Sequence, residues 1–176
     1  MAKMKRAIVL ADTRPLKKWD FKIPQNVKMI LNVKADIKQI LKLGKKFKWQ
    51  KPEKCDHCNE TTLWGHGFVI SFFDGFEQEL YLKRYRCPYC HTVFKLKPLG
   101  YFKKFQADAR TIFSSILKRV YKGRYLPGIS WSRQHFWFKA LKRNINAYLS
   151  NTWENGIIAG FRELVRMNKI PVTSSI

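Results

Sequence analysis

The spacing of apolar residues changes along the chain, and these changes predict where helices give way to strands. From Gln25 to Gly44, apolar residues recur close to the 3.6-residue helical period, which predicts one amphipathic helix ended by the glycine. The middle of the chain is rich in β-branched and aromatic residues and predicts strands at 61–73, 79–86 and 92–97. Asp74-Gly75 is a hairpin-turn signal between the first two strands.

Three further helices are expected after Pro98, because apolar stripes at helical spacing return there. The second of them is expected to bury Phe136 or Trp137. The predicted landmarks are a stripe from Phe102 to Val120 stopped by Gly123, a second helix capped by the hydroxyl of Ser130 or Ser132, and a third that starts near Asn151 in a capping box with Glu154.

This pattern predicts an α+β protein with three parts. Residues 1–54 form a basic N-terminal arm with the amphipathic helix, residues 55–98 a cysteine-containing ribbon, and residues 99–176 a helical domain. The ribbon therefore lies between an N-terminal helix and a C-terminal three-helix bundle that is expected to resemble a helix-turn-helix.

Two C-x2-C motifs contain every cysteine of the protein: Cys55 with Cys58, and Cys87 with Cys90. Four thiolates suit the tetrahedral coordination of zinc and leave no open position for water, so one structural zinc ion is expected. A redox pair or an iron–sulfur cluster is the alternative. His57, His66 and His91 lie near the motifs and are rival ligands.

The charge of the chain points to polyanionic partners. There are 35 Lys and Arg against 12 Asp and Glu, a net charge of +23. Residues 1–54 hold 16 basic and 4 acidic side chains, residues 55–98 hold 5 and 5, and residues 99–176 hold 14 and 3. The phosphates of nucleic acid are the first expectation and an anionic membrane surface the second.

No segment approaches the roughly 20 apolar residues that span a bilayer. The apolar run at 7–11 is too short for a secretory leader. A cytoplasmic, nucleoid-associated protein with no membrane partner is therefore expected.

The candidate nucleic-acid contacts gather on the predicted second helix of the C-terminal domain, with Arg133 and Gln134 placed to read base edges and lysines placed to meet phosphates. A solvated basic helix face is the alternative. The full set is Arg133, Gln134, Lys139, Lys142, Arg143 and Asn146 on this helix, Lys83, Arg84 and Arg86 on the second strand, and Lys48 and Lys51 before the first cysteine.

Several sequence runs together resemble the zinc-ribbon head of bacterial insertion-sequence transposases and their small stand-alone relatives. The resemblance covers roughly residues 40–150. Its implication is a four-cysteine ribbon paired with a helix-turn-helix that binds DNA, with a transposition factor or another protein as a partner. The runs are His66-Gly67, Leu82–Cys87, Pro88–Cys90, Thr92–Leu96, and Ile129–Gln134 with Trp137.

The acids that the catalytic part of such enzymes needs for paired metals are not found, because the acidic residues outside 55–98 are scattered singly. We therefore expect a non-enzymatic, zinc-containing protein that binds duplex DNA as an accessory factor or regulator. The alternative is an RNA-binding or ribonucleoprotein-assembly module, in which aromatic residues among basic ones, such as Trp49 and Tyr81, stack on unpaired bases.

Overall fold

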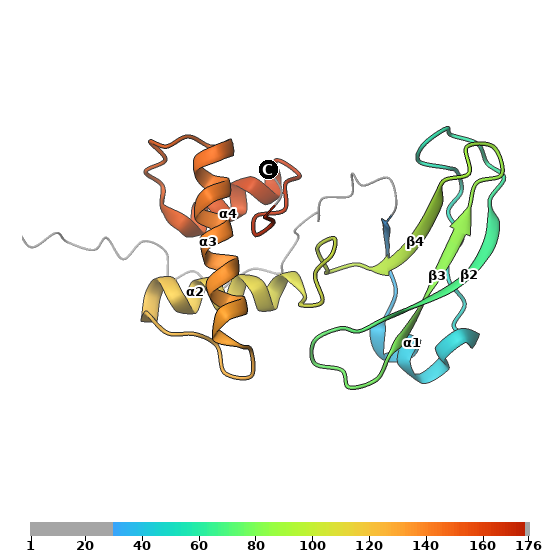
Figure 1. Cartoon of the computed structure of the whole chain (residues 1–176), viewed down its shortest axis with the longest axis horizontal. Coiled ribbons are helices and arrows are strands. Elements are labelled where there is room, and N and C mark those ends of the chain that lie inside the picture. Colours follow the sequence, from blue (N-terminus) through green and yellow to red (C-terminus); the bar gives the residue numbers. More distant parts are fainter. Residues whose placement is uncertain (1–29, 175–176) are drawn as a thin grey trace, which may run out of the picture.

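The computed structural model describes residues 30–174, which form an α+β fold with a four-stranded sheet, confirming the expected class. Helices α2, α3 and α4 group on one side, and the sheet lies with α1 on the other (Figure 1). The elements are β1 Ile30–Val33, α1 Ile37–Leu43, the short 3-10 helix η1 Gly44–Lys46, β2 Trp64–Ser71, β3 Leu80–Arg86, β4 Val93–Pro98, α2 Ala109–Lys122, α3 Trp131–Tyr148 and α4 Gly156–Arg166. The apolar run at 7–11 and the first residues of the predicted helix, 25–29, lie outside the described residues.

The single helix predicted up to Gly44 is wrong. Ile30–Val33 is instead a strand, β1, which pairs in parallel with β4 from Lys95 to Pro98. The helix begins only after Asp36, whose carboxylate accepts a hydrogen bond from the Lys38 amide at 3.0 Å. The apolar spacing in this segment suits a helix and a short strand equally, and pairing with β4 decides between them.

The sheet has the strand order β1-β4-β3-β2, and the three strands predicted in the middle of the chain are present. β2 and β3 are shorter than predicted, and β4 is shifted by one residue. Asp74 and Gly75 form a turn within the longer loop that joins β2 to β3. The pairing of β2 with β3 shifts register between Gly65 and Phe68, and Gly67 there has a positive φ of 70°. The bulge bends the edge strand of the sheet.

The three C-terminal helices are present; α2 and α4 begin later than predicted, whereas α3 begins directly after Ser130, one of the two predicted cap residues. Phe102 and Phe105 precede α2, which starts after Asp108, whose side chain accepts from the Thr111 amide at 2.8 Å. Ser130 holds the cap position of α3 without a side-chain hydrogen bond, and α4 begins after Asn155 because a turn occupies residues 151–152.

One large apolar cluster fills the helical half and includes Phe102, Phe113, Trp137 and Phe161. Trp137 is the buried member of the predicted pair, since Phe136 is 44% exposed.

Polar contacts join the two halves. The Asp74 amide in the β2–β3 loop donates to the Gln106 carbonyl at 3.1 Å, and the Asp74 carboxylate pairs with Arg133 on α3 at 2.8 Å. These contacts bring the hairpin loop against the start of α3. Among residues 30–174, no helix has the length and apolar character needed to cross a membrane.

Candidate metal centre and basic surfaces

The four cysteines meet at one end of the sheet. Their sulfur atoms all lie within 4.8 Å of one another, with Cys55 and Cys90 sulfurs 3.5 Å apart and Cys58 and Cys87 sulfurs 3.6 Å apart. Four sulfurs that each lie about 2.3 Å from a central ion are about 3.8 Å apart in a tetrahedron. The cluster therefore has the donors and the spacing to hold one metal ion.

The two cysteine turns are built alike. In each, the amide of the first cysteine donates to the carbonyl five residues on: Cys55 to Glu60 at 2.7 Å and Cys87 to Thr92 at 3.0 Å. The residue after each second cysteine takes a left-handed backbone, with φ of 61° at Asn59 and 58° at His91. This repetition presents two pairs of thiols to one point from separate parts of the chain.

The electrostatics of the cluster favour a bound cation. Hydrogen bonds from Thr92 lower the pKa of the Cys90 thiol to about 5. At Cys58 a backbone hydrogen bond at Glu60 lowers the pKa, but desolvation and the neighbouring cysteine sulfurs outweigh it and raise the pKa to about 12. A positive ion bound between the four sulfurs would favour the thiolate form of all of them, that of Cys58 included.

The three rival histidines are not part of the cluster. Of the residues that the structure describes, the four cysteines are the only group of at least three metal-binding side chains that meets the spacing of a site. His91 instead lies 3.2 Å from the guanidinium of Arg86, and the His57 amide donates to the Cys55 sulfur at 3.4 Å. An all-thiolate donor set of this kind suits zinc or iron.

Gln134 does not have the position expected of a base-reading residue. It is 1% exposed, and its amide makes the four hydrogen bonds that a glutamine side chain can make. The oxygen accepts from the Ser115 hydroxyl at 2.7 Å and the Leu126 amide at 2.8 Å, and the nitrogen donates to the carbonyls of Leu126 at 2.9 Å and Ile129 at 2.8 Å. Gln134 therefore ties α2 and the α2–α3 loop to α3.

Arg133 is also engaged within the protein. Besides its ion pair with Asp74, its guanidinium lies 5.2 Å from the ring centroid of Trp137. A base contact by Arg133 would have to break the ion pair. The loop from Gly123 to Ser130 is also longer than the turn of three or four residues that is typical of a helix-turn-helix.

The other candidates on α3 face solvent. Lys139, Lys142, Arg143 and Asn146 are all exposed, and Lys142 lies over the ring of Phe138 at 5.0 Å. Their spacing places them opposite the residues that α3 buries. We call these four side chains the exposed face of α3.

The candidates on the sheet are less accessible. The Lys83 amine lies 4.5 Å from the ring centroid of Phe68, and the buried Nε atom of Arg84 has no hydrogen-bond partner. Arg86 is exposed beside His91, and Lys48 and Lys51 are exposed in the segment before the first cysteine. The structure thus separates the predicted contacts into several surfaces.

A cluster of aromatic residues at the start of α3 was not predicted. Trp131 is 60% exposed and stacks on His135 with ring centroids 4.9 Å apart, while Tyr125 meets the Trp131 ring edge-on at 6.0 Å. The Arg119 guanidinium lies 4.8 Å from the Tyr125 ring centroid. The four-residue offset between Trp131 and His135 on a helix is the sequence signal that could have found it.

No protein-family model, curated protein or solved structure matches the chain.

Proposed function

We propose that this protein is a non-enzymatic DNA-binding protein, stabilised by one zinc ion, whose helical half binds duplex DNA. We also propose that the protein is related to insertion-sequence transposases, as the ribbon motifs suggest, and acts as an accessory factor or regulator. The protein would then be located at the nucleoid.

Zinc is the metal that the donor set favours in this proposal. Four cysteine sulfurs supply the tetrahedral thiolate shell in which zinc is structural, since no position is left for a reacting water. Bound there, the ion would join the turn at Cys55 to the turn at Cys87 and so add stability that a small sheet lacks by itself.

The observation that carries DNA binding is the unbalanced charge of the helical half. Residues 99–176 hold 14 basic and 3 acidic side chains, a net charge of +11. Two of the three acids are already engaged: Asp108 caps α2, and Glu163 pairs with Arg166 on α4. The remaining cations far outnumber the acidic side chains available to them and suit a closely spaced row of phosphates.

The geometry favours contacts to phosphates over contacts to bases. Gln134 is buried and Arg133 is paired, so the two side chains best suited to base edges are occupied. The exposed face of α3 keeps two lysines and an arginine, which bind phosphates of any sequence. We therefore expect strong dependence on salt and weak dependence on sequence.

Fluorescence anisotropy with labelled duplex DNA over a series of salt concentrations tests the proposal. The double variant Lys139→Gln/Lys142→Gln should bind roughly tenfold more weakly and lower the salt slope by about two. The double variant Lys34→Gln/Lys42→Gln, on the sheet half, loses the same charge and should keep most of the affinity. A flat salt series rejects DNA binding, and equal losses in both variants reject the helical half as its site.

The aromatic cluster at the start of α3 favours a second candidate, binding of single-stranded RNA. Trp131, His135 and Tyr125 offer ring faces next to the Arg119 cation, which is the combination that stacks on unpaired bases. The exposed fraction of Trp131 leaves room for a base.

Competition between duplex DNA and single-stranded RNA separates the two candidates. Trp131→Ala should weaken RNA binding by roughly 5- to 100-fold if bases stack there, and should leave duplex binding unchanged. Trp64→Ala is the matched control, because Trp64 on β2 is also 60% exposed. Equal affinity of the two variants for RNA rejects this candidate.

A further inference from the structure

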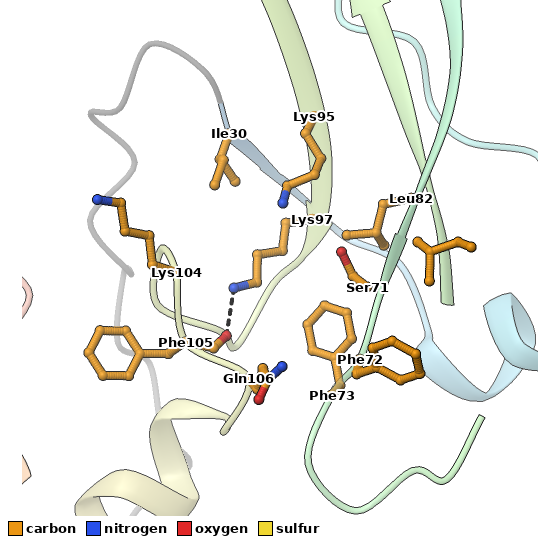
Figure 2. Close-up of a pocket in the computed structure, with 11 residues that line it drawn as sticks. Ile30, Ser71, Phe72, Phe73, Leu82, Lys95, Lys97, Lys104, Phe105 and Gln106 are labelled. Carbon is orange, nitrogen blue, oxygen red and sulfur yellow. Dashed lines mark hydrogen bonds between the residues drawn. The ribbon is translucent and has the colours of Figure 1, made fainter. Parts of the chain in front are cut away.

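A pocket of about 260 Å³ lies between the sheet and the segment that leads to α2 (Figure 2). Its walls come from β1, β2, β3 and β4 and from residues 104–106. Ile70 and Phe72 line it, and they are 49% and 54% exposed. The pocket is therefore smaller than the cavities that hold drug-sized ligands and has an apolar side open to solvent.

Lys97 provides a fixed cation at the inner end of this pocket. It is 5% exposed, and its amine donates to the Phe102 carbonyl at 2.7 Å and to the Phe105 carbonyl at 2.8 Å. A lysine ammonium has three N–H groups, so one remains for a ligand. Figure 2 shows the side chains of Lys95 and Lys97 extending from the same strand into the pocket, with the Lys97 amine at the Phe105 carbonyl and the Lys104 amine pointing away.

Among the described residues that line the pocket, none is acidic and could balance these charges. The same residues include Lys95, Lys97 and Lys104. The register of β3 with β4 places Arg84 directly opposite Lys95, and two like charges at such a pair of positions destabilise a sheet. Burial lowers the pKa of Lys97 to about 8, with repulsion from Lys95 as a second cause, and burial lowers the pKa of Lys95.

We propose that this pocket is an anion site that binds one phosphate group between the amines of Lys95 and Lys97. The carbonyls of Phe102 and Phe105 hold the Lys97 amine in place, so little reorganisation is needed when the anion arrives. The exposed ring of Phe72 leaves space for a group attached to the phosphate. The site lies on the sheet and does not depend on DNA binding by α3.

Sulfate titrations of the full-length, metal-loaded protein test the site without any nucleic acid. Sulfate keeps its double charge near neutral pH, and sodium chloride holds the ionic strength constant. We expect saturable binding of sulfate, measured by calorimetry and by the NMR signal of the Lys97 side chain. Lys95→Gln should weaken it at least tenfold, whereas Lys42→Gln, which removes an exposed charge on α1, should leave it unchanged.

Lys97→Met should abolish sulfate binding, but this change also removes two hydrogen bonds and can prevent folding. Lys95→Gln keeps those hydrogen bonds, so it tests by itself whether sulfate binding in the folded protein depends on the lysine pair. Absence of saturable binding to the wild-type protein, or equal binding by Lys95→Gln and Lys42→Gln, overturns the proposal. In that case Lys97 serves only to hold the segment that contains Phe102 and Phe105.

Two further titrations identify the source of the phosphate. Inorganic phosphate is compared with a short single-stranded oligonucleotide that carries either a 5′-phosphate or a 5′-hydroxyl. Preference for the 5′-phosphate that is lost in Lys95→Gln assigns the site to nucleic-acid ends. Binding of inorganic phosphate alone, with the same dependence on Lys95, assigns it to a free anion. Both outcomes can be distinguished even if Lys139→Gln/Lys142→Gln shows that the exposed face of α3 does not bind DNA.

Discussion

The two halves of the molecule bury their interiors by different means. The helical half has one continuous apolar cluster that contains four large rings: Phe102, Phe113, Trp137 and Phe161. The sheet half has two smaller clusters, and one of them includes Cys55 and Cys87, both fully buried. One cluster of the sheet half thus combines two candidate metal ligands with apolar side chains such as Phe94, whereas the cluster of the helical half contains no cysteine.

The two halves should therefore lose stability in response to different changes. An apolar core loses stability in proportion to the atoms removed, but a metal-dependent core is lost when the ion leaves. The charge differs in the same sense, since residues 30–98 hold 13 basic and 7 acidic side chains and residues 99–176 hold 14 and 3. In the function proposed above, one half holds its shape around an ion and the other binds a polyanion.

The largest expected effect is that of metal removal. Cys87→Ser should lose the bound ion, because three sulfurs remain, and metal analysis should fall from one ion per chain towards zero. Structural zinc contributes about 10 kcal/mol or more in small domains, so the sheet half should unfold while the helical circular dichroism signal persists. His57→Ala, in the Cys55–Cys58 turn but outside the cluster, should keep the ion. Unchanged metal content in Cys87→Ser contradicts the site.

A change in the helical core should do the reverse. Phe161 is 1% exposed and its ring centroid lies 4.9 Å from that of Phe113. Phe161→Ala should lower the free energy of unfolding by about 3–5 kcal/mol and leave the metal content unchanged. Phe136→Ala, on the exposed side of α3, is the control. Loss of metal in Phe161→Ala would mean that the halves unfold as one unit.

Gln134 tests whether a polar residue in the helical half is structural or reads bases. Gln134→Ala leaves buried partners on α2 and in the loop unsatisfied and should cost about 2–3 kcal/mol in urea unfolding. The exposed Asn146→Ala should cost less than about 0.5 kcal/mol. A Gln134→Ala protein of full stability with altered base preference would restore the role predicted from the sequence.

The smallest expected effect is a dependence of stability on pH that arises from Lys97, which lies where the two halves meet. The pKa of Lys97 is about 8 in the folded protein and about 10.5 when unfolded, so the unfolded chain binds more protons between these values. Stability should therefore rise by about 2 kcal/mol from pH 7 to pH 9.5, to which the lowered pKa of Lys95 adds in the same direction.

The raised pKa of Tyr101, caused mainly by burial, opposes this rise only near pH 10 and above. Urea unfolding in chloride buffer measures the change, and Lys97→Met should flatten most of it. An unchanged slope in Lys97→Met assigns the pH dependence to other groups.

Local signals predicted much of the fold. The β-branched and aromatic runs between Thr61 and Lys97 predicted three strands correctly, and Gly123 ends α2 as expected with a positive φ of 65°. The helix predicted from Gln25 failed at Ile30–Val33, because a short apolar segment takes the structure of the partner it pairs with. That partner, β4, lies more than sixty residues away.

The sequence by itself identified the four cysteines of the candidate metal site and the balance of charge, because these depend on which residues are present and on the short C-x2-C spacings. Tertiary contacts bring the two cysteine turns to one point. Tertiary structure alone decided which polar residues are free. Arg133 and Gln134 look like base readers when α3 is considered by itself, yet Asp74 and the α2–α3 loop occupy them. Lys95 and Lys97 look like ordinary strand lysines until the segment before α2 packs against the sheet, binds the Lys97 amine through two carbonyls and completes the pocket that both lysines line. The burial and pairing of a side chain depend on contacts between distant segments, which local spacing does not encode.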